Sequence, residues 1–307
     1  METIARPQNI ARGIVLVVAA ALAISVQDVV FKLFSSQLTL WQIFALRGFL
    51  AIPLLLAIGK ISGTNSETSL WRTALSRWPL LRSLFITTTF LAFYAAIPFL
   101  SLSTVGAANY IAPIFVTLLS AYVISEPVGV RGWIGVVLGF VGVVVLLQPG
   151  SDAFSLWALL PVVGAAFYAL AHTTTRAKCQ DVSVAALALS QNLIMCAAGI
   201  VISLLISIVQ PSGEIAQAFP YIFGTWATLS ANDWAVLVLL AVFAVGVGML
   251  LAGAYQAAPP PTVATFEYSY LVFVALWDIV FFALMPSMVS VAGMMLIVGA
   301  GLLVMRR

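Results

Sequence analysis

Long apolar stretches separated by short polar segments make up most of the chain. Ten stretches are long enough to cross a bilayer, because a hydrocarbon core about 30 Å thick takes about 20 apolar residues of helix. They lie at residues 13–34, 38–59, 80–100, 104–124, 131–148, 157–176, 183–208, 232–255, 262–284 and 287–305. The pattern predicts an all-α integral membrane protein with ten transmembrane helices.

The composition strengthens this interpretation. Hydrophobic residues make up 63% of the 307 residues and charged residues 7%, whereas soluble domains are about 45–50% apolar and about 25% charged. These values exclude a soluble enzyme, a nucleic-acid-binding protein and a disordered chain. Two cysteines and one histidine are too few for a disulfide framework or a multi-histidine metal site, so we expect no metal and no cofactor.

The basic residues predict the orientation. With ten crossings, every Lys and Arg except two falls at the same face, and Arg82 and Arg176, at helix ends, count among them. The remaining two, Lys32 and Arg47, lie deeper within the predicted helices. Basic residues favour the cytoplasmic side, so we expect both termini in the cytoplasm.

Two segments of the chain are similar to each other. Residues 103–127 align with residues 261–286, and the alignment pairs Tyr110 with Tyr268. Each segment lies in the fourth helix of a five-helix half. Because five is odd, the second half has the opposite orientation in the membrane, as in many secondary transporters. The prediction is two inverted five-helix repeats, at residues 1–150 and 151–307.

Three motifs carry a resemblance to a known family: Asp28 and Lys32 followed by Arg47-Gly48, Ala112-Pro113 through Ser125-Glu126-Pro127, and Phe266-Glu267-Tyr268. With them the chain resembles the drug/metabolite transporter superfamily, in its EamA-type ten-helix branch. The resemblance implies transport of amino acids, nucleotide-linked metabolites, vitamins or drugs across the bacterial inner membrane. Members usually have an acidic residue at the end of both fourth helices, whereas here the second copy reads Leu284-Met285-Pro286.

Charged side chains within the predicted helices are the first candidate site residues. Each costs about 2.5–3.5 kcal/mol at a helix centre. Asp28 and Lys32 are four residues apart on one helix face, at a depth compatible with Arg47 on the next helix. Two interpretations remain open: an ion pair that fixes the first two helices or gates transport, and a contact to a charged group of the solute.

Glu267 has no basic partner in its own helix, which suits a carboxyl that exchanges protons or contacts the solute. The alternative is a hydrogen-bonded structural residue.

Aromatic residues suit a cavity for planar solutes, and the alternative is that they only pack helices together. Pro113 would kink its helix and permit gating. His172 is expected at the surface. The other proposed solute contacts are Tyr94, Tyr110, Tyr268 and Trp277.

These features favour a secondary carrier that works by alternating access, whose proton coupling is left open. A cation and an anion among aromatics predict an amino acid or related zwitterion as solute. Riboflavin or S-adenosylmethionine is the alternative. A lipid-modifying enzyme is disfavoured because the acidic residues are dispersed.

The expected partners of the protein are the solute and the bilayer, with no nucleic acid. We expect a monomer or a weak homodimer, since the spacing of Gly135 and Gly139 suits close helix packing.

Overall fold

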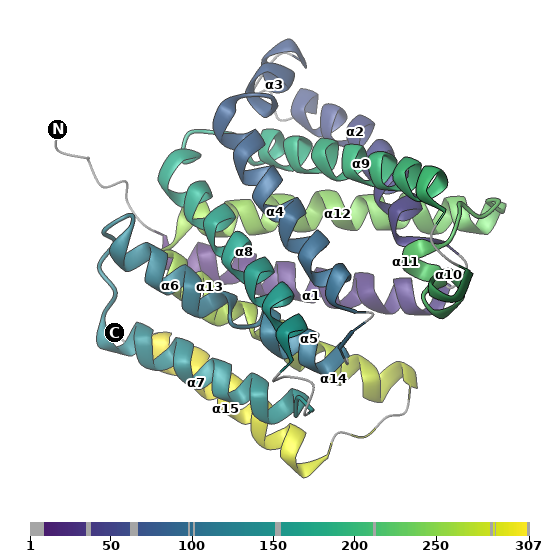
Figure 1. Cartoon of the computed structure of the whole chain (residues 1–307). Helices are drawn as coiled ribbons and strands as arrows, with labels where there is room; N and C mark the ends of the chain where they lie inside the picture. The colour runs from purple at the N-terminus through teal and green to yellow at the C-terminus, as the bar shows by residue number, and fades with distance from the viewer. Residues whose placement is uncertain are drawn as a thin grey trace. The chain divides into compact units, whose positions relative to one another are not determined.

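The structure is a computed structural model of the chain. It describes residues 9–34, 38–61, 67–97, 99–100, 102–150, 155–210, 213–282, 285 and 287–305. In these ranges the chain forms helices and no strands (Figure 1). Ten described segments are long and apolar enough to cross a membrane, so the predicted crossings are confirmed.

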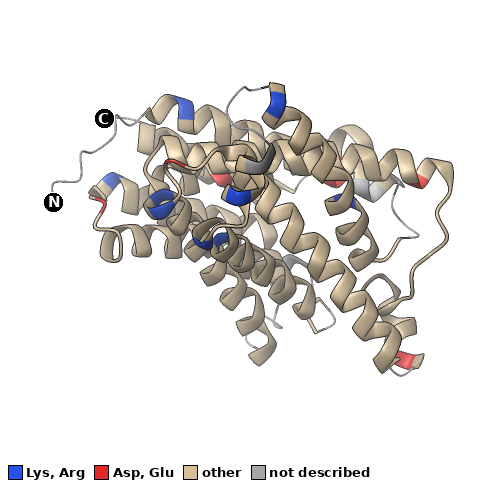
Figure 2. Cartoon of the chain, turned by 90° about the horizontal axis from the view of Figure 1, so that it is seen from above, with Lys and Arg blue, Asp and Glu red and all other residues tan. Residues whose placement is uncertain are grey.

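Most crossings are single helices that lie within a few residues of their predicted bounds. They are α1 (Ile10–Phe34), α2 (Leu40–Ile61), α4 (Arg77–Ala96), α7 (Val130–Leu147), α8 (Leu159–Lys178, preceded by a 3₁₀ turn at Leu156–Ala158), α9 (Val184–Val209), α12 (Ala231–Ala257) and α15 (Met288–Met305). Short helices outside the crossings are α3 (Glu67–Ala74), α10 (Gly213–Ala218) and α11 (Pro220–Phe223). Charged residues are sparse along the crossings (Figure 2).

The fourth and ninth crossings differ from the others because each consists of two helices. The fourth comprises α5 (Leu102–Asn109) and α6 (Ala112–Tyr122), and the ninth comprises α13 (Pro260–Glu267) and α14 (Ser269–Phe282). The hydrophobic pattern predicts each crossing as one continuous helix, because a short break in the helix does not interrupt the run of apolar residues. These two crossings also carry the similar segments of the sequence.

Contacts divide the chain into two compact units. Unit 1 comprises Met1–Ser25, Thr88–Asp181 and Leu250–Arg307, and unit 2 comprises Val26–Thr87 and Val182–Met249. Both units draw on both halves of the sequence. The repeat boundary at residue 150 and the inverted relation of the halves stay predictions.

In unit 1, α7 packs on α15 through small residues. A Cβ atom at Gly142 would lie 2.8 Å from the carbonyl oxygen of Gly293, and Gly139 lies against the ring of Tyr268. Glycines at these positions let two helices approach closely. The glycine face of α7 therefore serves packing inside this unit.

In unit 2, α2 packs on α9 in the same manner. A Cβ atom at Gly199 would lie 2.6 Å from the backbone nitrogen of Ala45. Arg82 is also inside this unit, with 1% of its surface exposed, and its guanidinium donates to the Gln191 side-chain oxygen at 3.3 Å. Its side chain turns inward to a polar partner, and its place on the cytoplasmic side stays a prediction.

Candidate functional site

The two interrupted crossings have different causes for their breaks. In the fourth crossing Pro113 has no N–H, so it cannot donate to the carbonyl of Asn109. In the ninth crossing the Leu271 N–H donates to the carbonyl of Tyr268, three residues earlier, at 3.1 Å. Helix α5 ends at Asn109 and α6 begins at Ala112, directly before Pro113. The kink at Pro113 and its role in gating stay predictions.

The breaks lie side by side in unit 1. The Tyr268 hydroxyl donates to the carbonyl of Tyr110 at 3.3 Å, and the ring centroids of these residues are 6.1 Å apart. Beyond the breaks, Val116 of α6 packs in one cluster with Val263 and Ala264 of α13. The crossings are therefore antiparallel neighbours.

Glu267 is the last residue of α13 and carries the central carboxyl of the site. Its Oε1 atom accepts hydrogen bonds from the hydroxyls of Tyr168 on α8, at 2.8 Å, and Tyr255 on α12, at 2.9 Å. The described residues give Oε2 no hydrogen-bond donor, and the side chain is only partly buried. Glu267 is thus hydrogen-bonded, as one interpretation expected, and keeps one carboxyl oxygen for another group.

The ring of His172 lies between the rings of Tyr168 and Tyr255. Its ring centroid lies 4.2 Å from that of Tyr168 and 4.1 Å from that of Tyr255, and 1% of its surface is exposed. The prediction of a surface histidine was wrong, because residue 172 lies one turn after Tyr168 on the face of α8 that packs on α12. We call Tyr168, His172 and Tyr255 the aromatic sandwich.

A second polar group lies two turns further along α8 from Tyr168. Arg176 donates to Oε1 of Glu126 from two guanidinium nitrogens, at 2.6 and 3.1 Å, and to the carbonyl of Gln256 at 3.0 Å. The Gln256 side chain donates to the carbonyl of Cys179 at 2.6 Å. We call Glu126, Arg176, Cys179 and Gln256 the Arg176 network. Arg176, expected among the cations of one face, is paired with Glu126, and 13% of its side chain is exposed.

The remaining predicted residues of unit 1 make packing contacts. Tyr94 lies against Phe93, with ring centroids 5.3 Å apart. Trp277 donates its indole N–H to the hydroxyl of Ser25 at 2.9 Å, which ties α14 to α1. Their contact with a solute stays a prediction.

The predicted charged cluster at Asp28, Lys32 and Arg47 stays a prediction too. Asp28 and Arg47 both lie in unit 2 and are partly buried. The Arg47 guanidinium lies 5.4 Å from the ring centroid of Phe44. The side chain of Lys32 lies outside the described residues.

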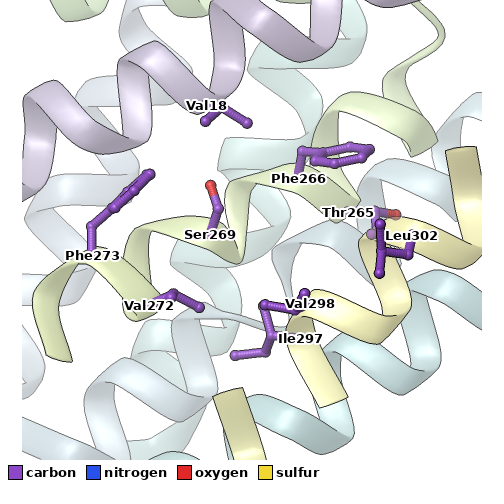
Figure 3. A pocket seen from close by; sticks show the side chains of 10 residues that line it. Val18, Thr265, Phe266, Ser269, Val272, Phe273, Ile297, Val298 and Leu302 are labelled. Carbon is purple, nitrogen blue, oxygen red and sulfur yellow. The ribbon is translucent and has the colours of Figure 1, made fainter. Parts of the chain in front are cut away.

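An apolar hollow of about 270 Å³ lies between α1, α13, α14 and α15 (Figure 3). Its lining includes Val18, Phe266, Ser269 and Phe273, and the Ser269 hydroxyl points into it (Figure 3). It does not include Glu267 or the aromatic sandwich. We therefore do not place the polar solute in this hollow.

Sequence reasoning missed Tyr255, Gln256 and the pairing of Glu126 with Arg176. The missing signal was the requirement that a tyrosine hydroxyl within the membrane finds a partner. It applies to Tyr255 near the end of α12 as much as to Tyr168.

The model of the EamA-like transporter family matches residues 11–148. This part of the chain is therefore similar to the EamA-like transporter family. The resemblance to this ten-helix branch is therefore confirmed.

Two proteins named riboflavin transporter are similar to parts of this chain. The one from Vibrio cholerae is 43% identical over 56 residues, which is 18% of each chain. The one from Rhizobium johnstonii is 29% identical over 195 residues, 63% of this chain and 58% of the relative. The chain thus matches less than two thirds of the length of either relative.

A solved crystal structure, described only as that of a protein, has a TM-score of 0.76 to this chain. Its sequence is 17% identical, and the match covers 95% of this chain and 97% of the other. At this identity the likeness concerns the fold alone.

Proposed function

We propose that the protein is a secondary membrane carrier that moves riboflavin or a similar planar, nitrogen-containing heterocycle by alternating access. The observation that carries the proposal is Glu267, a carboxyl held by two tyrosine hydroxyls at the break of a membrane-spanning helix. Interrupted helices frame the solute sites of many secondary carriers. The two relatives named riboflavin transporter support this solute class.

The chemistry of the site favours a solute that donates hydrogen bonds. Glu267 offers an acceptor at Oε2, and the helix ends at Asn109 and Glu267 present backbone carbonyls with partial negative charge. An amino acid would also bring a carboxylate that needs a cation, and Arg176 in this unit already binds Glu126. The predicted zwitterion is therefore a competing solute for the test.

Glu267 is also our candidate for proton coupling. With two hydroxyl donors on Oε1, the proton of a neutral carboxyl group goes to Oε2, and Oε1 then still accepts both bonds as a carbonyl oxygen. The tyrosines therefore hold Glu267 in the same place in both protonation states.

We place the carrier in the bacterial inner membrane, with both termini in the cytoplasm. We further propose that it consists of two inverted repeats and acts as a monomer.

The test is uptake by the purified chain in liposomes. Radiolabelled riboflavin, S-adenosylmethionine and a set of amino acids are compared, each with and without a proton gradient. We expect saturable riboflavin uptake that changes when the gradient is collapsed. Saturable uptake of an amino acid, with none of riboflavin, would overturn the proposal. Insensitivity to the gradient would remove proton coupling alone.

A further inference from the structure

The apolar hollow between α1, α13, α14 and α15 can be reached from the bilayer. All its lining residues belong to unit 1 and to segments that can cross a membrane. Two of them on α15, Val298 and Leu302, are 46% and 56% exposed. Because α15 is a membrane-spanning segment, this exposed apolar surface contacts lipid chains rather than water. A compound dissolved in the bilayer therefore has access to the hollow.

The volume and the lining of the hollow suit a small hydrocarbon compound. None of its lining residues is charged, and its volume is about 270 Å³. An engineered apolar cavity of about 150 Å³ in another protein stays dry and binds benzene. By proportion, the hollow has room for a compound of about ten carbon atoms.

One hydroxyl group in the hollow has no hydrogen-bond partner among the described residues. The Ser269 oxygen is buried, and its side chain points into the hollow (Figure 3). Other hydroxyls of unit 1 donate to the carbonyl four residues earlier, as those of Thr117, Ser120 and Thr265 do. A buried hydroxyl group without a partner costs free energy, and a ligand that bonds to it removes this cost.

The corresponding residue of the fourth crossing is apolar. The alignment that pairs Tyr110 with Tyr268 also pairs Ile111 with Ser269. Both crossings are interrupted beside these tyrosines, although only the ninth has a hydroxyl group directly after its tyrosine. The break itself therefore does not account for the Ser269 hydroxyl, whereas recognition of a ligand does.

We propose that the hollow binds an apolar compound of about ten carbon atoms with a single hydroxyl or carbonyl group, which enters from the bilayer. The apolar lining contacts the hydrocarbon part, and the Ser269 hydroxyl bonds to the oxygen. Phe266 and Ser269 lie on either side of the break, so the ligand contacts both α13 and α14. The site does not include Glu267, and the inference does not depend on which solute is transported.

The test is photolabelling of the purified chain in liposomes with a diazirine analogue of octanol. Mass spectrometry of peptides locates the label, and octanol and octane compete at equal concentrations in the bilayer. Ser269→Ala removes the hydroxyl group, and Val298→Phe adds a larger side chain at the exposed rim of the hollow. Ser120→Ala and Val291→Phe are the matched controls, because Ser120 bonds within α6 and Val291 is exposed on α15 but does not line the hollow.

We expect the label around the hollow, on α13, α14 and α15. Octanol should displace it at about fivefold lower concentration than octane, as for one added hydrogen bond. Ser269→Ala should remove this difference, Val298→Phe should reduce labelling about fivefold or more, and both controls should label like the wild type. Thermal unfolding in detergent should show Ser269→Ala at least as stable as the wild type, because the hydroxyl loses no protein partner.

Three results would each overturn the inference. If octane displaces the label as well as octanol does, or if Ser269→Ala keeps the preference for octanol, the hydroxyl group does not recognise the ligand. If the label is spread evenly over the lipid-facing helices and Val298→Phe leaves it unchanged, the hollow contains bilayer lipid only. These results leave the proposed function untouched, because that function is tested by uptake and not by labelling.

Discussion

Tyr168 and Tyr255 donate their hydroxyl hydrogens to the same oxygen atom of Glu267. The two tyrosines come from α8 and α12, and His172 lies between their rings. Three helices of unit 1 therefore meet at one carboxyl oxygen. Because the two hydroxyls hold Oε1, they also fix the position of Oε2 of Glu267.

Tyr168→Phe and Tyr255→Phe should each weaken transport without unfolding the protein. Each removes a hydrogen bond to a charged group, worth about 1.5–3 kcal/mol, and lets the carboxyl group rotate. We expect KM for riboflavin to rise about tenfold in each variant. Tyr122→Phe is the control, because Tyr122 is 78% exposed on α6. If KM is unchanged in both Tyr168→Phe and Tyr255→Phe, these tyrosines do not position the Glu267 carboxyl group.

The pH dependence of KM should depend on Glu267. A proton on Oε2 removes the acceptor for the solute, so acidification on the solute side should raise the wild-type KM. Glu267→Gln places an amide where the carboxyl group was, and its KM should be high and independent of pH. Initial uptake rates over a pH series measure both. A Gln variant that keeps the wild-type pH profile would exclude Glu267 as the titrating group.

Breaking the Arg176 network should expose Cys179. The Cys179 side chain is fully buried, and its carbonyl binds Gln256, which in turn contacts Arg176. Removing one partner of a largely buried ion pair costs about 3–5 kcal/mol. In a Cys196→Ser background, Arg176→Gln and Glu126→Gln should raise the rate of maleimide labelling about tenfold or more.

The control for this labelling experiment is Lys178→Gln. Lys178 lies at the same end of α8 and is exposed, so its replacement should leave the labelling rate unchanged. Equal labelling rates in all variants would show that the network does not protect this part of unit 1.

Gly142→Ala should destabilise the packing of α7 on α15. The new methyl group would lie 2.8 Å from a backbone oxygen of Gly293, and overpacking of this kind costs about 1–3 kcal/mol. Gly246→Ala is the matched control, since no atom lies within 4 Å of its Cβ position on α12. Thermal unfolding in detergent should show a lower Tm for Gly142→Ala alone.

The ten crossings could be predicted because a helix needs a run of apolar residues of a certain length to span the hydrocarbon core of a bilayer. A kink at Pro113 could also be predicted, since proline lacks an N–H, but the division of this crossing into two helices was not. The break at Tyr268 was not predictable either, because no helix-breaking residue lies at that position and the interruption accompanies packing of Tyr268 against Gly139.

Partners of the polar residues were the part that the sequence could not supply. Glu267 was identified from its charge, but its bonds to Tyr168 and Tyr255 depend on how α8, α12 and α13 pack. His172 was placed at the surface for the same reason, and the burial of Arg82 was not predicted. A charge count assigns a residue to an end of a helix, whereas tertiary packing decides whether its side chain turns inward.

The close fit of α7 to α15 has a consequence for biogenesis. The ribosome makes α15 after the other described helices, so the glycine face of α7 enters the bilayer before α15 exists. During that interval lipid chains occupy this face, and they leave it when α15 packs there. A photo-crosslinker on this face of α7 should therefore label lipid more strongly in nascent chains arrested before Met288 than in the completed protein.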